Sequence, residues 1–320
     1  MKNQRLPVLV IGYARRSTLI GLVEVATSSN VSAIYISIDG PKNESVKRIQ
    51  EDILETLALY QKKSLIPIRI MRRSENLGAG AAVVAAIDWF FNLEEEGVVL
   101  EDDLVVDQTF FQYVSEVLPK VRSDSRILSI SGTRLLPSSE LQPSLTSYPL
   151  AWGWATTRDK WMVMRSLIFK RSSPLRNHNS VKEWIFWKTG KRRALNSYID
   201  AWDIPLAEGM VSANYFTLVP PVNLVSNVGF DSSATHTITP EWPLNLPRLQ
   251  NYPAPVTLNL EESVLFVNDQ FIRSEIYAIS HRHLISGVLA LIFDPLRFMR
   301  QHKNVSLLEK SSIKEPNHDS

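Results

Sequence analysis

The first 131 residues alternate between short apolar, β-prone runs and longer stretches in which apolar residues recur at helical spacing. The runs that predict strands are residues 6–13, 33–38, 67–71, 98–100 and 126–131. The stretches that predict helices are residues 17–29, 44–63 and 78–91, followed by a helix that Asp107 caps. Strands that alternate with helices are typical of an α/β architecture. We therefore predict a mostly parallel, Rossmann-like central sheet flanked by helices.

Polar residues follow each of the first four predicted strands. They are Arg15 and Arg16, Asp39, the run at 72–76, and the acids at 101–103. In parallel sheets of this class the ligand crevice lies at the carboxyl ends of the strands. We therefore expect these side chains to converge on one rim.

The fourth predicted strand runs directly into Glu101, Asp102 and Asp103. Clustered carboxylates repel one another and resist desolvation, so an apolar strand rarely ends this way without a reason. A divalent cation such as Mg²⁺ or Mn²⁺ relieves the repulsion, because it prefers oxygen ligands and bridges carboxylates to phosphates. The alternative is a solvated strand end with no bound ion.

The second half of the chain loses this alternation and becomes richer in proline and tryptophan. Helical patterns are expected at 158–168 and at 181–188, the latter stopped by Gly190. We predict an α/β subdomain at 1–135 and a second subdomain at 136–260. A helical segment at 261–305, which either associates with a membrane, forms a dimer or packs on the catalytic domain, and a disordered tail at 306–320 complete the prediction.

Composition narrows the function. The chain has no cysteine, which excludes disulfides, zinc thiolates and cysteine nucleophiles and suits a reducing, cytoplasmic compartment. The net charge of +2 argues against a broad nucleic-acid surface. No segment approaches the roughly 20 apolar residues of a membrane-spanning helix, and the first apolar run is too short for a signal peptide. The basic flanks of residues 281–303 leave peripheral contact with the cytoplasmic membrane face open.

Six short stretches together carry a resemblance to a known family. They are residues 9–18 (LVIGYARRST), 37–40 (SIDG), 76–78 (NLG), 99–103 (VLEDD) with Phe110-Phe111, 152–156 (WGWAT) and 201–203 (AWD). In this order they resemble GT-A fold glycosyltransferases similar to N-acetylglucosaminyltransferase I, the group of bacterial sugar transferases sometimes labelled haemolysin-like. The resemblance covers about residues 6–237.

The resemblance implies a donor site. Asp103 would bind the metal, and Asp102 would contact the ribose or a metal-bound water. Glu101 would contact the donor sugar or backbone, or would instead orient the residues that bind the ligand. Asp39 would accept from the uracil N–H, or simply cap a turn. The other donor contacts implied are Ala14, Arg15 or Arg16, Asn76, Leu77 and Gly78, where Asn76 either faces the nucleotide or shapes the turn.

The resemblance also implies residues around the sugar and a catalytic base. It makes residues 1–135 the nucleotide-sugar-binding subdomain and residues 136–260 the acceptor-binding, catalytic subdomain. Trp152, Gly153 and Trp154 would form a wall behind the sugar, or pack in the core. Asp203 is the first candidate for the catalytic base, followed by Asp200 and Glu208; the family's second aspartate at this place is Ile204 here. An N-cap role for Asp203 stays open. His236 would close over the donor as a metal or diphosphate ligand, or serve a structural purpose.

The predicted function is a metal-dependent (Mn²⁺ or Mg²⁺), inverting transfer of sugar from a nucleotide donor, UDP-sugar first, to a cell-surface polysaccharide or lipid-linked glycan. A nicotinamide dehydrogenase or a sugar nucleotidyltransferase is disfavoured, because residues 12–15 lack the glycine-rich loop that either enzyme places after its first strand. A non-enzymatic glycan-binding or membrane-active protein is the remaining alternative. The sequence leaves the oligomeric state open.

Overall fold

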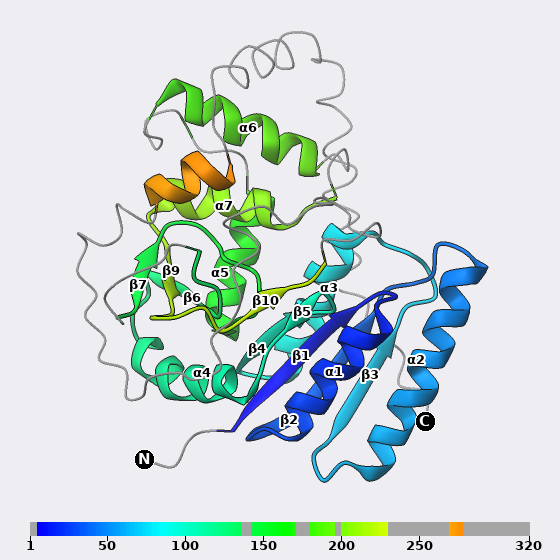
Figure 1. Ribbon diagram of the computed structural model, residues 1–320. Coiled ribbons are helices and arrows are strands. Elements are labelled where there is room, and N and C mark those ends of the chain that lie inside the picture. Colours follow the sequence, from blue (N-terminus) through cyan, green and yellow to red (C-terminus); the bar gives the residue numbers. More distant parts are fainter. Residues whose placement is uncertain are drawn as a thin grey trace.

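The computed structural model describes residues 5–135, 142–170, 174, 180–195, 200–229 and 269–277. Its central feature is an eight-stranded sheet in the order β3-β2-β1-β4-β8-β6-β9-β7. Strands β1 (Leu6–Gly12), β2 (Val31–Ile38), β3 (Ile68–Arg72) and β4 (Glu96–Glu101) are parallel to one another. The predicted α/β class with a mostly parallel sheet is confirmed (Figure 1).

The strands of the second half extend the same sheet. β8 (Trp154–Thr157) lies antiparallel between β4 and β6 (Ile127–Ser131), while β9 (Phe216–Val219) is parallel to β6 and β7 (Ser144–Thr146) closes the edge. Hydrogen bonding is thus continuous across the boundary expected near residue 135. The division into a donor and an acceptor half stays a prediction.

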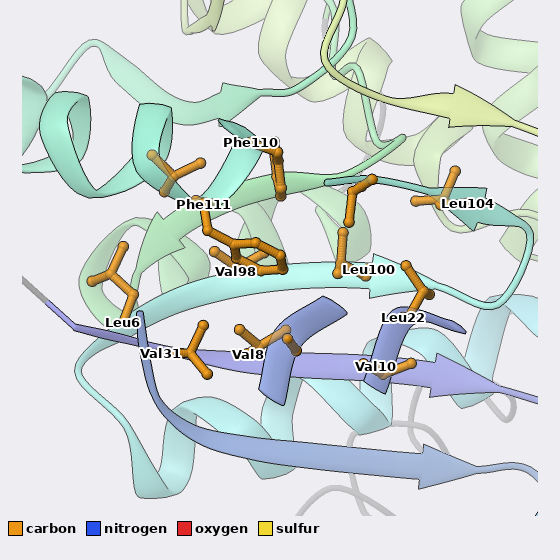
Figure 2. Packing of buried hydrophobic residues seen from close by; sticks show 14 of the residues in the cluster. Leu6, Val8, Val10, Leu22, Val31, Val98, Leu100, Leu104, Phe110 and Phe111 are labelled. Atoms are coloured by element: carbon orange, nitrogen blue, oxygen red, sulfur yellow. The ribbon is translucent and has the colours of Figure 1, made fainter. Parts of the chain in front are cut away.

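Helices cover both faces of the sheet, as the side-chain alternation of its strands requires. Val8 and Val10 of β1 point into a core shared with α1 (Arg16–Thr27), α2 (Glu44–Lys63) and α4 (Gln108–Val121). Leu9 and Ile11 point to the opposite core, which contains α3 (Ala79–Leu93), α5 (Arg158–Phe169) and α7 (Asp203–Ala213). Figure 2 shows the first of these layers, with labelled residues Val8, Val10, Val98, Leu100, Phe110 and Phe111.

The predicted helices agree closely with the structure except at Gly190, and α7 is a helix that sequence analysis did not predict. Asp107 caps α4 as expected, since its Oδ1 accepts from the Thr109 N–H at 2.9 Å. The prediction that Gly190 ends a helix is wrong, because α6 runs through it from Val181 to Leu195. A Cβ on Gly190 would lie 3.2 Å from Ile204 Cγ2, so the glycine serves the close approach of α6 to α7 rather than a helix end.

A third apolar cluster lies beside α6 and α7. Leu135, Tyr148, Trp187 and Ala207 pack there around Ile272 of the π-helical turn η2 (Ile272–Ile276). Figure 1 shows this turn, in orange, beside α6 and α7. Asp269 fastens the segment by accepting hydrogen bonds from Thr146 Oγ1 at 2.7 Å and the Ser147 N–H at 2.8 Å. The described part of the predicted 261–305 segment is therefore packed on the fold, whereas the apolar stretch with basic flanks at 281–303 lies outside the described residues.

Candidate functional site

The ends of the parallel strands meet as the sequence pattern predicts. Ile11 of β1 pairs with Glu101 of β4, and Gly12 pairs with Ile38 of β2. Beyond these pairs, the Asp102 N–H donates to the Ile11 carbonyl at 2.9 Å. The polar turns that follow β1, β2 and β4 therefore lie side by side at one edge of the sheet.

Asp102 is buried and organises the turn between β1 and α1. Its Oδ2 accepts from the backbone N–H of Tyr13 at 2.7 Å and of Arg15 at 3.4 Å, and Thr18 Oγ1 donates to its backbone carbonyl. Burial raises the pKa of Asp102 to about 6, although the Tyr13 N–H and the Arg15 guanidinium oppose the shift. One carboxylate oxygen of Asp102 thus already has internal partners, which gives Asp102 a structural role in the turn between β1 and α1.

Asp103 meets a late segment of the chain. Its backbone carbonyl accepts from the Val228 N–H at 2.8 Å, and its Oδ2 accepts from Asn227 Nδ2 at 3.3 Å. Here β10 (Ser226–Asn227) pairs antiparallel with β5 (Leu104–Val105). A Cβ on Gly229 would lie 2.7 Å from the Cβ of Asp103, so only glycine allows this approach. Burial raises the pKa of Asp103, against the opposing effect of Arg15.

Arg15 is the cation of this cluster. Its Nη1 lies 3.9 Å from Asp102 Oδ1 and 4.0 Å from Asp103 Oδ2, and its Nη2 donates to the Gly229 carbonyl at 3.3 Å. Arg16 points elsewhere, because its Nε forms an ion pair with Asp52 Oδ2 of α2 at 2.5 Å. The sequence left Arg15 and Arg16 open as alternatives, and the structure places Arg15 beside the acids.

Glu101 and Asp203 come together from opposite halves of the chain. The pKa of Glu101 is raised well above its ordinary value, first by burial and then by the charges of Asp103, Asp203 and Asp102. Asp203 is the first residue of α7, within the residues that sequence analysis assigned to the second subdomain. The structure thus brings the first candidate for the base to the acids at the end of β4.

The Asp39 carboxylate is occupied by a turn of its own chain. Its Oδ1 accepts from the Leu77 N–H at 3.0 Å, and its Oδ2 accepts from Asn76 Nδ2 at 2.9 Å and the Gly78 N–H at 3.2 Å. Asn76 Nδ2 also donates to the Gly40 carbonyl at 2.8 Å. The turn-shaping alternative for Asn76, and a turn-holding role for Asp39, match these contacts. A contact with a nucleobase stays a prediction for both.

Arg73 lies near the Asp39 turn. Arg72 is exposed, whereas Arg73 is partly buried, and its N–H donates to the Ile38 carbonyl at 3.0 Å. Burial lowers the pKa of Arg73, and the nearby Asp39 charge opposes the shift. A cation therefore accompanies the Asp39 turn just as Arg15 accompanies the acids of β4.

The other two candidate bases are engaged in internal contacts. Asp200 accepts hydrogen bonds from the first backbone N–H groups of α3. Glu208 is 1% exposed and forms an ion pair with the buried Lys191 at 2.8 Å, whose Nζ also donates to the Leu167 carbonyl. Both contacts stabilise the fold, which leaves Asp203 as the candidate for the catalytic base.

The tryptophan motif divides between core and surface. Trp154 is buried and stacks on Trp202, with ring centroids 5.9 Å apart, so it follows the core alternative. Gly153 has a φ of +63°, and a Cβ there would lie 2.8 Å from Val225 Cγ2. Trp152 is partly buried between two apolar clusters and is the member left as a candidate sugar contact. His236 lies outside the described residues.

Tyr277 is a site neighbour that sequence analysis missed. Its ring packs edge-on against Trp187 at 4.8 Å and lies 5.4 Å from Tyr148. The pKa of Tyr277 is raised well above its ordinary value by burial first, and then by the Asp203 and Tyr148 charges. No local pattern marks a tyrosine of this kind, because its neighbours come from α6, α7 and the segment before β8.

The acid cluster suits a cation ligated partly from outside the protein. No three His, Cys, Asp or Glu side chains within the described ranges are arranged as a complete metal site. Asp103 nevertheless presents a partly exposed carboxylate, with 25% of its side chain accessible, among mutually repelling acids. Mg²⁺ commonly uses one or two carboxylates and takes its other ligands from phosphates and water. Asp103 therefore fits a metal ion that would take its other ligands from a diphosphate and water.

Comparisons with known proteins give only distant likenesses. No family model matches the chain, and no curated sequence matches it. HddC from Yersinia pseudotuberculosis is similar over 48% of this chain and 77% of its own, with 10% identity and a TM-score of 0.29. UDP-glucose pyrophosphorylase complexed with UDP-glucose is similar over 68% of this chain and 90% of its own, with 9% identity and a TM-score of 0.37. Because both TM-scores lie below 0.5, neither likeness carries an inference about activity.

Proposed function

We propose that the chain is a metal-dependent, inverting glycosyltransferase that takes a sugar from a nucleotide donor, UDP-sugar first. The observation that carries this proposal is the meeting of Asp103, Glu101 and Asp203 beside Arg15 at the carboxyl end of the central strands. Ligands of parallel α/β sheets bind at that edge. The arrangement supplies carboxylates for a cation and a base within one small region.

The donor side of the site is built for a diphosphate. A divalent cation held by Asp103 would neutralise negative charge on the departing diphosphate. Arg15, which already lies 4.0 Å from Asp103 Oδ2, supplies a second positive charge to the same group. Asp102 contributes by fixing the turn from Tyr13 to Arg15, so that Arg15 is held in place before the donor arrives.

The acceptor side needs one base. In an inverting transfer the acceptor hydroxyl oxygen attacks the anomeric carbon, the bond from that carbon to the diphosphate breaks, and a carboxylate takes the hydroxyl proton. Asp203 is suited to this step because it begins α7, is partly exposed, and is near enough to Glu101 for its charge to raise the pKa of Glu101. Trp152 is the candidate for apolar contact with a sugar ring.

The acceptor is proposed to be a cell-surface polysaccharide or a lipid-linked glycan. Among the described residues, no helix is both long and apolar enough to cross a bilayer. The same proposal places the enzyme at the cytoplasmic membrane face, through peripheral contact of the apolar stretch with basic flanks at 281–303.

Two isosteric variants test the assignment. UDP with Mn²⁺ should stabilise the wild-type protein against thermal unfolding, by about 2.7 kcal/mol at 100 times the dissociation constant. Asp103→Asn should lose this stabilisation. Asp203→Asn should keep it but slow release of UDP from UDP-sugars by about 10²- to 10⁴-fold, the usual effect of a general base.

A surface variant and a donor panel complete the test. Glu116→Gln, in an exposed pair with Lys120, should match the wild type in both measurements. A panel of nucleotide sugars identifies the donor by its released nucleotide. Unchanged stabilisation of the Asp103→Asn protein by UDP and Mn²⁺ would refute the site, and favour the non-enzymatic alternative.

A further inference from the structure

The helix α3 is capped by a carboxylate from a distant segment. Its own N-cap residue is Gly78, which offers no side chain for this purpose. Instead Asp200 Oδ2 accepts from the Ala79 N–H at 2.7 Å, and Asp200 Oδ1 accepts from the Gly80 N–H at 2.6 Å. A carboxylate that accepts two helix-terminal N–H groups is favoured both by hydrogen bonding and by the helix dipole.

Two glycines make room for this contact. Gly78 has a φ of +81°, and a Cβ there would lie 2.7 Å from Asp200 Oδ2. A Cβ on Gly80 would lie 3.2 Å from Asp200 Oδ1 and 3.5 Å from the backbone of Ala201. The Gly-Ala-Gly sequence at 78–80 therefore admits the 200–201 segment at close range.

The peptide at 77–80 is held from two sides. Asp39 accepts the N–H groups of Leu77 and Gly78, and Asp200 accepts the next two, from Ala79 and Gly80. Asp39 directly follows the strand β2, and its hydrogen bonds to Leu77 and Gly78 do not involve Asp200. The loop that precedes α3 should thus keep its shape without Asp200, whereas the 200–203 segment would lose its attachment to α3.

The same segment carries Asp203. Trp202 is buried and stacks on Trp154 at 5.9 Å, and Asp203 follows at the start of α7 beside Glu101. We propose that Asp200 is a positioning residue: by capping α3 it pins the 200–203 segment to the donor half and sets Asp203 against Glu101. This proposal rests on the proposed function, in which Asp203 is the base.

The first test separates turnover from donor binding. Asp200→Ala should lower kcat by about 10- to 100-fold, because a small misplacement of a reacting group has effects of that size. The dissociation constant for UDP with Mn²⁺ should stay within about twofold of the wild type, since Asp39 still holds the loop. Asp107→Ala removes a cap of the same kind from α4, and should leave both constants unchanged.

Two further variants separate positioning from stability. Gly80→Ala favours the helix by propensity but pushes on Asp200, so it should lower kcat without lowering the melting temperature. In the Asp203→Asn background, Asp200→Ala should have no further effect on turnover, because Asp200 acts through Asp203. Additive losses in this double variant, or a Gly80→Ala protein with wild-type kcat, would overturn the proposal.

Hydrogen exchange distinguishes this proposal from the proposed function. In Asp200→Ala the amides of 79–83 and of 201–206 should both exchange faster, whereas Asp107→Ala should change only the start of α4. Faster exchange in 79–83 alone would refute the positioning role, whatever the activity. Asp200→Ala can also speed exchange in both segments while the wild-type protein neither binds UDP with Mn²⁺ nor releases UDP from UDP-sugars. That result would refute the glycosyltransferase function but support the attachment of the 200–203 segment to α3 by Asp200.

Discussion

The turns after β2 and β4 lie at the same edge of the sheet, on either side of β1. Their carboxylates have opposite surroundings. Asp39 accepts hydrogen bonds from Asn76, Leu77 and Gly78, so both of its oxygens have internal donors. The pKa of Glu101 is instead raised by burial first and then by the charges of Asp103, Asp203 and Asp102. The acid after β2 is thus a structural anchor, whereas Glu101 at the end of β4 carries a charge that its acidic neighbours disfavour.

The comparison yields a rule that mutations can break. Removing an anchored carboxylate leaves donors or a cation unsatisfied and should lower stability. Removing a crowded carboxylate relieves repulsion and should leave stability equal or higher, at the expense of function.

The largest loss is expected at Glu208, an anchored carboxylate. Glu208→Gln leaves Lys191 charged and buried, with 2% of its side chain exposed, and should lower the free energy of unfolding by about 3 to 5 kcal/mol. Urea unfolding at neutral pH measures this loss. Burial already lowers the pKa of Lys191, and Glu208 opposes that shift.

A second substitution checks the cause. Lys191→Met in the Glu208→Gln background removes the stranded cation, and should recover most of the lost free energy. The exposed pair of Glu116 and Lys120 is the control, where Glu116→Gln should change the free energy of unfolding by less than about 0.5 kcal/mol. Equal losses at Glu208 and Glu116 would contradict the anchoring role.

The next largest loss is expected at Asp39. Asp39→Ala should lower the free energy of unfolding by about 2 to 3 kcal/mol, because the turn at 76–78 loses its acceptors. Asp39→Asn should be nearly as harmful, since both oxygens accept and an amide NH₂ would face one set of donors. Thermal or urea unfolding compares the two variants. A fully stable Asp39→Asn protein would show that only one oxygen matters.

Sequence reasoning predicted the sheet because its signals are local. Apolar runs and helical spacing located β1 to β4 and their helices to within a few residues, and parallel strands then force the turns after them to meet. That topology brings the turn after β1 to the acids after β4, whereas the choice of Arg15 over Arg16 depends on side-chain contacts.

Sequence reasoning could not assign the partners that individual carboxylates choose. Asp200, Glu208 and Asp203 look alike as acids in a proline- and tryptophan-rich segment, but tertiary contacts give them a helix cap, a buried ion pair and a place beside Glu101. Gly190 was misjudged for the same reason, because the close approach of α6 and α7 overrides its tendency to end helices.

The smallest change in stability, and the sharpest test of the rule, is expected at Glu101. Glu101→Gln keeps the shape of the side chain but removes a charge that Asp103, Asp203 and Asp102 disfavour. In metal-free buffer the free energy of unfolding should therefore stay equal or rise by up to about 1 kcal/mol, the opposite sign to Asp39→Asn. Urea unfolding of both variants, in parallel with UDP release from the preferred donor, measures the contrast. A loss of stability in Glu101→Gln comparable to that in Asp39→Asn would mean that Glu101 is also an anchor, and the functional distinction between the two turns would fail.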